Sequence, residues 1–274
     1  MSVPLALPAA LAYGVADFAG GLAGRRISVV TVTAGAQLFG LVALVPAVFL
    51  VPGEPAVAAL GIGALAGIAG ASGLLLYFRG LAVGPMGVVA PLSAVVGAGL
   101  PLLIGIVGGE RLAVPTVLGL VVALAAIVLA TTGTRDAVAL RGVLFGLASG
   151  AGFGLFFVGL DATPEGSGLW PLLAGRMVSV VLLGVLVLAV RPGPLRGSTG
   201  LVVLSGVFDT AANVLFLLAT RVGDLGVSAV LVSLYPVVVV LLARIVLHER
   251  LSAAQVTSAG LALTASALLA LGAP

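Results

Sequence analysis

Long apolar stretches, each closed by a short polar break, are the main pattern along this chain. The breaks are charged residues, prolines and glycine clusters. They recur at the spacing of about twenty residues that a helix needs to cross the hydrocarbon core of a bilayer. This pattern predicts an all-α integral membrane protein with ten transmembrane helices. The predicted helices cover residues 4–24, 29–51, 56–77, 86–108, 113–132, 142–160, 169–190, 199–220, 225–247 and 251–271.

Composition indicates the same environment. Of the 274 residues, 61% are hydrophobic and 8% are charged, and the mean hydropathy is +1.36. A soluble domain carries about 25% charged residues, so this chain has too few charges to build a water-facing surface. We therefore expect a multi-pass protein of a bacterial-type plasma (inner) membrane, with the lipid bilayer as a partner.

The residue types that most site chemistry needs are scarce. The chain has no cysteine and one histidine, which excludes a disulfide framework and a thiolate metal site. Its basic residues are scattered arginines rather than a patch, so no nucleic-acid partner is expected. No P-loop, zinc-protease or nucleophile-elbow pattern occurs. We expect no enzyme activity, no catalytic residues, no metal site and no cofactor.

The two halves of the chain resemble each other when the sequence is shifted by 139 positions. This offset places Gly84 on Gly223 and Gly87 on Gly226, and it places Glu-Arg-Leu at 110–112 on Glu-Arg-Leu at 249–251. Each half holds five predicted helices, so the second half enters the membrane from the opposite side. Such inverted repeats are typical of secondary transporters. The predicted division is a first repeat at 1–134, a linker at 135–141 and a second repeat at 142–274.

Several motifs occur in the order and spacing of a known family. They are YFRGLAVGP at 77–85, ERL at 110–112, SLYP at 233–236 and HERL at 248–251. With these motifs the chain resembles the drug/metabolite transporter superfamily and, within it, the EamA-like permeases. The resemblance implies two inverted five-helix repeats around a central cavity, with the fifth and tenth helices at the periphery. It also implies transport, commonly export of amino acids and other metabolites in bacterial members, without naming one substrate.

Arg176 is a candidate for substrate binding because it lies inside the seventh predicted helix. A charged side chain near the bilayer centre costs at least about 2.5 to 3.5 kcal/mol, so it tends to face a cavity or a partner. The offset of 139 pairs Arg176 with Gln37, which gives both halves a long polar group at one position. We expect both to bind substrate, with the guanidinium taking a carboxylate or phosphate. The alternative is an arginine that pairs with an internal carboxylate or extends to the interface.

The eighth predicted helix carries a polar stripe. Ser205, Asp209 and Asn213 are spaced four residues apart, so they share one helix face. We expect this face to line a water-filled path and to contact the substrate. Asp209 is also a candidate for proton coupling, and the alternative is a structural pair with Arg176.

Asp17 is a second candidate for proton coupling and for substrate binding. It follows Tyr13 by four residues and therefore shares its face of the first predicted helix. The alternative is a pairing near the arginines that end this helix. Tyr77 and Tyr235 complete the predicted binding residues, although aromatic residues near helix ends are also typical of interfacial anchors.

These observations favour a secondary transporter that moves small organic metabolites, amino acids or similar, as an exporter working by alternating access. The expected partners are a small-molecule substrate and a proton as candidate coupling ion, and the chain acts as a monomer or homodimer. The first alternative is a multidrug or cation efflux carrier, with Asp17 or Asp209 dominant and Arg176 structural. A non-transporting scaffold is less favoured. Arginines cluster in the odd-numbered loops, which places both termini outside the cytoplasm.

Overall fold

The computed structural model of the chain describes residues 3–107, 114–132, 137–222, 232, 235–248 and 253–271. Helices joined by turns and short irregular segments make up these ranges, and no strand occurs within them. The helices are α1 (Val3–Gly24), α2 (Val29–Leu50), α3 (Val57–Val83), α4 (Met86–Val107), α5 (Val114–Thr132), α6 (Ala137–Asp161), the short 3-10 helix η1 (Glu165–Ser167), α7 (Trp170–Val190), α8 (Thr199–Val222), α10 (Tyr235–Val246) and α11 (Ala253–Leu271).

Two of these helices differ clearly from the predicted ranges. Helix α3 continues past Tyr77 to Val83, because Arg79 lies on an exposed face and does not interrupt it. The break comes at Gly84 and Pro85, where proline lacks the N–H that a helix needs. Helix α6 already begins at Ala137, so most of the predicted linker at 135–141 is helical. The motifs at 110–112 and 249–251, the glycines at 223 and 226, and Ser233 and Leu234 lie outside the described residues.

Six helices within the described ranges are long and apolar enough to cross a membrane: α1, α2, α3, α6, α7 and α8. Shorter apolar segments occur in α4, α10 and α11, at Met86–Gly97, Tyr235–Val246 and Val256–Ala265. The side chains on the outer faces of these helices are largely aliphatic and exposed, as in Phe49, Leu50, Val57 and Leu188. Such an apolar surface is stable in lipid and not in water.

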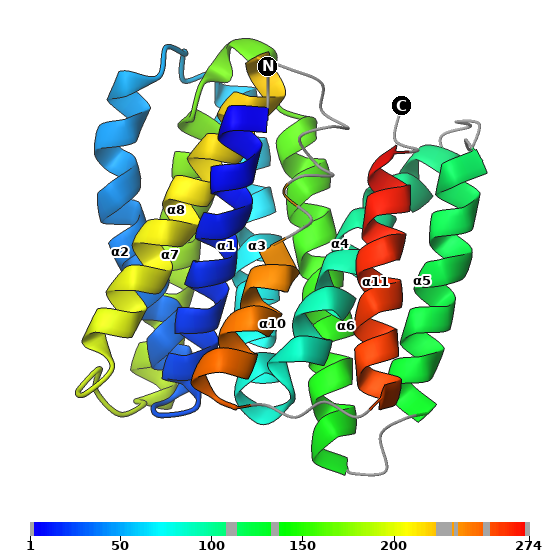
Figure 1. The fold of residues 1–274 in the computed structure, drawn as a ribbon. Helices are drawn as coiled ribbons and strands as arrows, with labels where there is room; N and C mark the ends of the chain where they lie inside the picture. Colours follow the sequence, from blue (N-terminus) through cyan, green and yellow to red (C-terminus); the bar gives the residue numbers. More distant parts are fainter. Residues whose placement is uncertain are drawn as a thin grey trace.

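The two halves run in opposite directions. In Figure 1, α1 descends from the end of the bundle marked N, whereas α6, the first helix of the second half, rises toward that end. Helix α11 ends at the same end at which α1 begins. The inverted repeat expected from an odd number of helices per half is therefore confirmed.

The halves interlock rather than sit side by side. The most extensive contacts join α3 to α6, α1 to α8, α5 to α11, α4 to α6, α3 to α7 and α2 to α8, and each of these pairs takes one helix from each half. Helices α5 and α11 pack against each other at one edge of the molecule (Figure 1). They are therefore peripheral, as the family resemblance implied.

Small residues permit two of these contacts, and the two are related by the repeat. The backbone of Gly67 on α3 meets the backbone of Gly175 on α7, so a Cβ on Gly67 would collide with the Gly175 carbonyl. Gly206 on α8, which is the repeat mate of Gly67, meets the carbonyl of Ala36 on α2 in the same way. Close backbone approach at small residues is a common basis of helix packing in membranes.

One end of the bundle is tightly packed. The largest buried apolar cluster among the described residues surrounds Tyr77, Phe78, Leu81 and Met86, where α3 ends and α4 begins. Arg25, just after α1, closes this end by donating to the carbonyls of Leu81 and Gly84, both at 3.0 Å. Most of the described arginines lie in loops or near helix ends at this end of the bundle: Arg25, Arg26, Arg79, Arg141, Arg191, Arg196 and Arg244.

Candidate functional site

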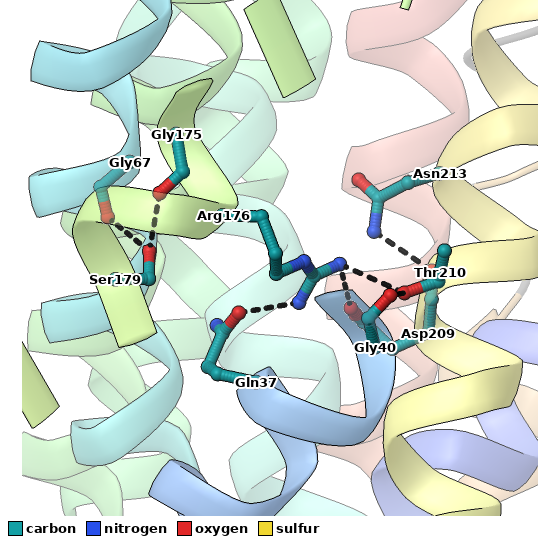
Figure 2. A network of polar contacts seen from close by, with 9 residues as sticks. All are labelled: Gln37, Gly40, Gly67, Gly175, Arg176, Ser179, Asp209, Thr210 and Asn213. Atoms are coloured by element: carbon teal, nitrogen blue, oxygen red, sulfur yellow. Dashed lines mark hydrogen bonds and ion pairs between the residues drawn. The ribbon is translucent and has the colours of Figure 1, made fainter. Parts of the chain in front are cut away.

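Arg176 on α7 lies at the centre of a polar network that joins three helices. Its guanidinium donates to Oε1 of Gln37 on α2. It also donates to Oδ2 of Asp209 on α8 at 2.7 Å and to Oγ1 of Thr210 at 3.3 Å (Figure 2). The Arg176 side chain is 10% exposed and that of Asp209 is 17% exposed. The arginine is therefore paired inside the protein and does not extend to the membrane surface.

The contact between Arg176 and Gln37 lies on the symmetry axis of the fold. The two residues are 139 positions apart, which is the repeat offset, so they are equivalent positions of the two halves. Equivalent positions meet only where the approximate twofold axis passes between them. The network therefore lies between the halves, where inverted-repeat carriers place their substrate.

Thr210 was missed by the sequence reasoning. Its hydroxyl accepts from Arg176 and donates to the carbonyl of Gly40 at 3.0 Å, which links α8 to α2. Gly40 carries no side chain here, and a Cβ would lie 2.7 Å from the threonine oxygen. Thr210 lies beside the predicted stripe rather than on it, so the four-residue spacing that marks the stripe does not include it.

The other two residues of the stripe differ in their surroundings. Asn213 is partly buried, and its amide nitrogen donates to the backbone carbonyl of Asp209 at 2.8 Å (Figure 2). Ser205 is buried, and its hydroxyl has no hydrogen-bond partner among the described residues. A buried polar group without a partner is uncommon and marks a place where another group can bind.

Asp17 on α1 faces α3. It is buried and accepts a hydrogen bond from the hydroxyl of Tyr77 at 3.1 Å. Arg25 donates to backbone carbonyls at the C-terminal end of α3, and no ion pair involves Asp17 within the described ranges. The pairing of Asp17 with the arginines that follow α1 was therefore the wrong alternative.

The remaining predicted residues connect Asp17 to the Arg176 network. The rings of Tyr13 and Tyr235 lie with their centroids 6.0 Å apart. Tyr13 interacts electrostatically with Asp17, Asp209 and Arg176, and Asp17 interacts with Asp209. Most of the predicted binding residues thus belong to one polar region between α1, α2, α7, α8 and α10.

The tyrosines of this region are not interfacial anchors. Tyr77 is fully buried and bonded to Asp17, and Tyr235 interacts electrostatically with the same carboxylate. Trp170 behaves differently, because its indole N–H donates to the carbonyl of Gly53 in the loop after α2. Trp170 therefore joins the start of α7 to the loop after α2 at one end of the bundle and does not reach the polar region.

A cavity of about 260 Å³ lies elsewhere, between α4, α10 and α11. Arg244 is its charged lining residue, beside aliphatic residues such as Val240 and Leu263, and none of the predicted binding residues lines it. Within the described ranges, no three His, Asp or Glu side chains gather in a way that could hold a metal ion.

Comparison with known proteins relates the whole chain to one family. The model of the EamA-like transporter family matches residues 1–132 and 140–271. Both the starts and the ends of these two ranges are 139 positions apart, as Gln37 and Arg176 are. No curated protein matches the chain. A solved structure described as "Crystal structure of protein" has a TM-score of 0.64 at 19% identity, covering 98% of this chain and 97% of that one, which shows a shared fold. The chain is a member of the EamA-like transporter family, whose proteins are transporters and not enzymes.

Proposed function

We propose that this transporter moves small organic metabolites, amino acids or similar, across the plasma membrane as an exporter working by alternating access. The observation that carries the proposal is the network around Arg176, in which polar side chains from both inverted halves meet inside an apolar protein. A carrier needs such a site, because two halves that exchange roles can expose it first to one side and then to the other.

The ion pair of Arg176 and Asp209 offers both charges that a zwitterion needs. An incoming carboxylate can replace Asp209 at the guanidinium, which binds carboxylates with two parallel hydrogen bonds. The ammonium group of the same solute brings a positive charge to a region that holds the carboxylates of Asp17 and Asp209. A zwitterion therefore adds no net charge to a medium of low dielectric constant.

The second candidate is an efflux carrier for organic cations. The observation that favours it is the engagement of Arg176 by Gln37, Asp209 and Thr210 at once. If this network is purely structural, the guanidinium is not available to a substrate. Recognition would then rest on the carboxylate of Asp17 alone.

Proton coupling through Asp17 or Asp209 is part of the proposal. Asp17 is buried and accepts a hydrogen bond from Tyr77, and Asp209 is paired with Arg176, so both carboxylates lie inside the protein, where a transported proton could bind. The measurement is uptake driven by an imposed pH gradient. If Asp17→Asn and Asp209→Asn each leave the effect of the gradient intact, neither residue carries the proton.

The orientation that we propose places the arginine-rich end of the bundle in the cytoplasm. The support is the gathering of the loop arginines at the end where α1, α3 and α7 finish. Short loops rich in arginine stay on the cytoplasmic side during membrane insertion. Both chain termini then lie outside.

The decisive experiment compares related solutes in proteoliposomes. We expect counterflow of at least one of the twenty amino acids, and a much slower flux of the amine that remains when its carboxylate is removed. Arg176→Gln should abolish the preference for the amino acid. Ser179→Ala, which removes a buried hydrogen bond between α7 and Gly67 outside the network, is the matched control. Equal flux of the amino acid and the amine would favour the cation carrier, and no flux of either would refute the proposal.

A further inference from the structure

The chain has three tyrosines, and all three lie around one carboxylate. Tyr77 donates a hydrogen bond to Asp17, and Tyr13 and Tyr235 interact with it electrostatically. Tyr13 and Asp17 come from α1, Tyr77 from α3 and Tyr235 from the first turn of α10. Three residues of a type that is rare in this chain therefore converge from three helices on Asp17.

The charges of the polar region do not balance within the described residues. Arg176 compensates Asp209 through a 2.7 Å ion pair. Asp17 is buried and has no ion-pair partner in the described part of the chain. With both carboxylates ionised, one guanidinium leaves an excess of one negative charge. A buried carboxylate either takes up a proton or needs a compensating charge, and the ammonium group of a ligand can supply that charge.

The hydrogen bonds of the region are also incomplete. The hydroxyl of Tyr13 is buried and has no partner among the described residues. An ammonium group has three donors and no acceptor. It can therefore donate to the Asp17 carboxylate and to the oxygen of Tyr13 at once. The faces of tyrosine rings carry negative potential and attract cations.

We infer that Asp17, together with Tyr13, Tyr77 and Tyr235, binds the ammonium group of the transported solute. The inference rests on the proposed function and narrows its substrate class to solutes that carry an amine. It applies to amino acids and to organic amines alike, because both bear this group. Arg176 then decides whether a carboxylate is also required.

The second half of the chain offers no equivalent site. The repeat mates of Asp17 and Tyr77 are Phe156 and Phe216. Each packs against Phe157 at a steep angle, with ring centroids 5.6 and 6.1 Å apart. The mate of Tyr13 is Gly152. At these described positions, the second half therefore does not repeat the arrangement around Asp17.

The test uses three related probes: leucine, 3-methylbutylammonium, which lacks the carboxylate, and 4-methylpentanoate, which lacks the amine. Binding to the purified full chain in lipid nanodiscs is measured by calorimetry, and flux is measured in proteoliposomes. We expect wild type to bind 3-methylbutylammonium. Asp17→Asn should weaken this binding by about tenfold to a hundredfold, the usual value of a hydrogen bond to a charged group. Its effect on 4-methylpentanoate should be less than twofold.

The control is Ser258→Ala, which removes a buried hydrogen bond between α11 and α5, far from the tyrosines. It should leave binding of all three probes unchanged. A second pair of variants covers the case in which Asp17→Asn does not fold. Tyr235→Leu removes the ring and should weaken binding of the ammonium probe by roughly threefold to twenty-fivefold. Tyr235→Phe keeps the ring and should lose less affinity than Tyr235→Leu, and equal losses would contradict a role of the ring.

The outcomes separate this inference from the proposed function. Saturable ammonium binding that depends on Asp17, without flux of any solute, supports the site and refutes transport of amines. Flux that Asp17→Asn leaves unchanged overturns the site and leaves the carrier function intact. The site is also overturned if wild type does not bind 3-methylbutylammonium. The same holds if Asp17→Asn lowers the affinity for 4-methylpentanoate and for 3-methylbutylammonium equally.

Discussion

At the scale of single residues, the main result is that Arg176 is already paired. The sequence left open whether this arginine awaits a substrate or neutralises an internal carboxylate, and the structure joins it to Asp209 and to Gln37. The two readings are compatible in a carrier. The ion pair between Arg176 and Asp209 stabilises the empty site. A solute that carries both charges can replace these contacts when it binds.

A double-mutant cycle measures the coupling of this pair. Asp209→Asn leaves the guanidinium without its counter-charge in a largely buried place, which should lower stability by about 3 kcal/mol. Arg176→Gln should have a similar effect, because it leaves Asp209 uncompensated. The double variant should be more stable than either single variant, as judged by thermal unfolding in detergent. Additive losses would contradict a direct interaction.

At the scale of helices, backbone approach determines how the halves fit together. Gly67 against Gly175 and Gly206 against Ala36 bring α3 to α7 and α2 to α8 at repeat-related positions. The helix α7 that carries Arg176 and the helix α8 that carries Asp209 are thereby both held against the other half. Their spacing sets the position of the polar region.

Substitution of these glycines should separate the helices. Gly67→Ala and Gly206→Ala each place a methyl group against a facing backbone carbonyl, and overpacking of this kind costs about 1–3 kcal/mol. Gly61→Ala on α3 and Gly200→Ala on α8 are matched controls, since a Cβ there meets no atom within 4 Å. The controls should be neutral or slightly stabilising, because alanine favours helix more than glycine does. Equal unfolding temperatures for Gly67→Ala and Gly61→Ala would exclude the close contact.

At the scale of the whole molecule, one end differs from the other in charge and in packing. The end that carries the loop arginines also contains the large apolar cluster around Phe78 and Met86. Helices α1, α3, α4 and α10 supply most of that cluster. With the proposed orientation, the cluster lies at the cytoplasmic end of the bundle.

Topology can be tested directly, because the chain has no native cysteine. Gly193→Cys lies after α7 at the arginine-rich end, and Gly166→Cys lies in η1 at the other end. Both glycines are exposed, and a Cβ on either meets no atom within 4 Å. We expect a membrane-impermeant maleimide to label Gly166→Cys in intact cells. It should label Gly193→Cys only after the cells are lysed. The reverse labelling would invert the orientation.

The sequence by itself determined the membrane class, the inverted halves, the family and most of the polar candidates. Span length, the odd helix number per half and the cost of burying charge are properties of the linear chain. Most helix bounds agree within a few residues for the same reason. The start of α6 lies five residues before the predicted start at residue 142, because residues 137–141 form helix ahead of the predicted membrane span.

Only the tertiary structure determined which residues the polar side chains contact. Whether Tyr77 anchors at an interface or bonds to Asp17 depends on how α3 is rotated about its axis and on which helix faces it. The role of Thr210 likewise depends on Gly40 lying across from it on α2. The meeting of Arg176 with Gln37 required the two halves to dock about a common axis. Periodicity shows which residues share a helix face, but packing between distant segments determines what that face contacts.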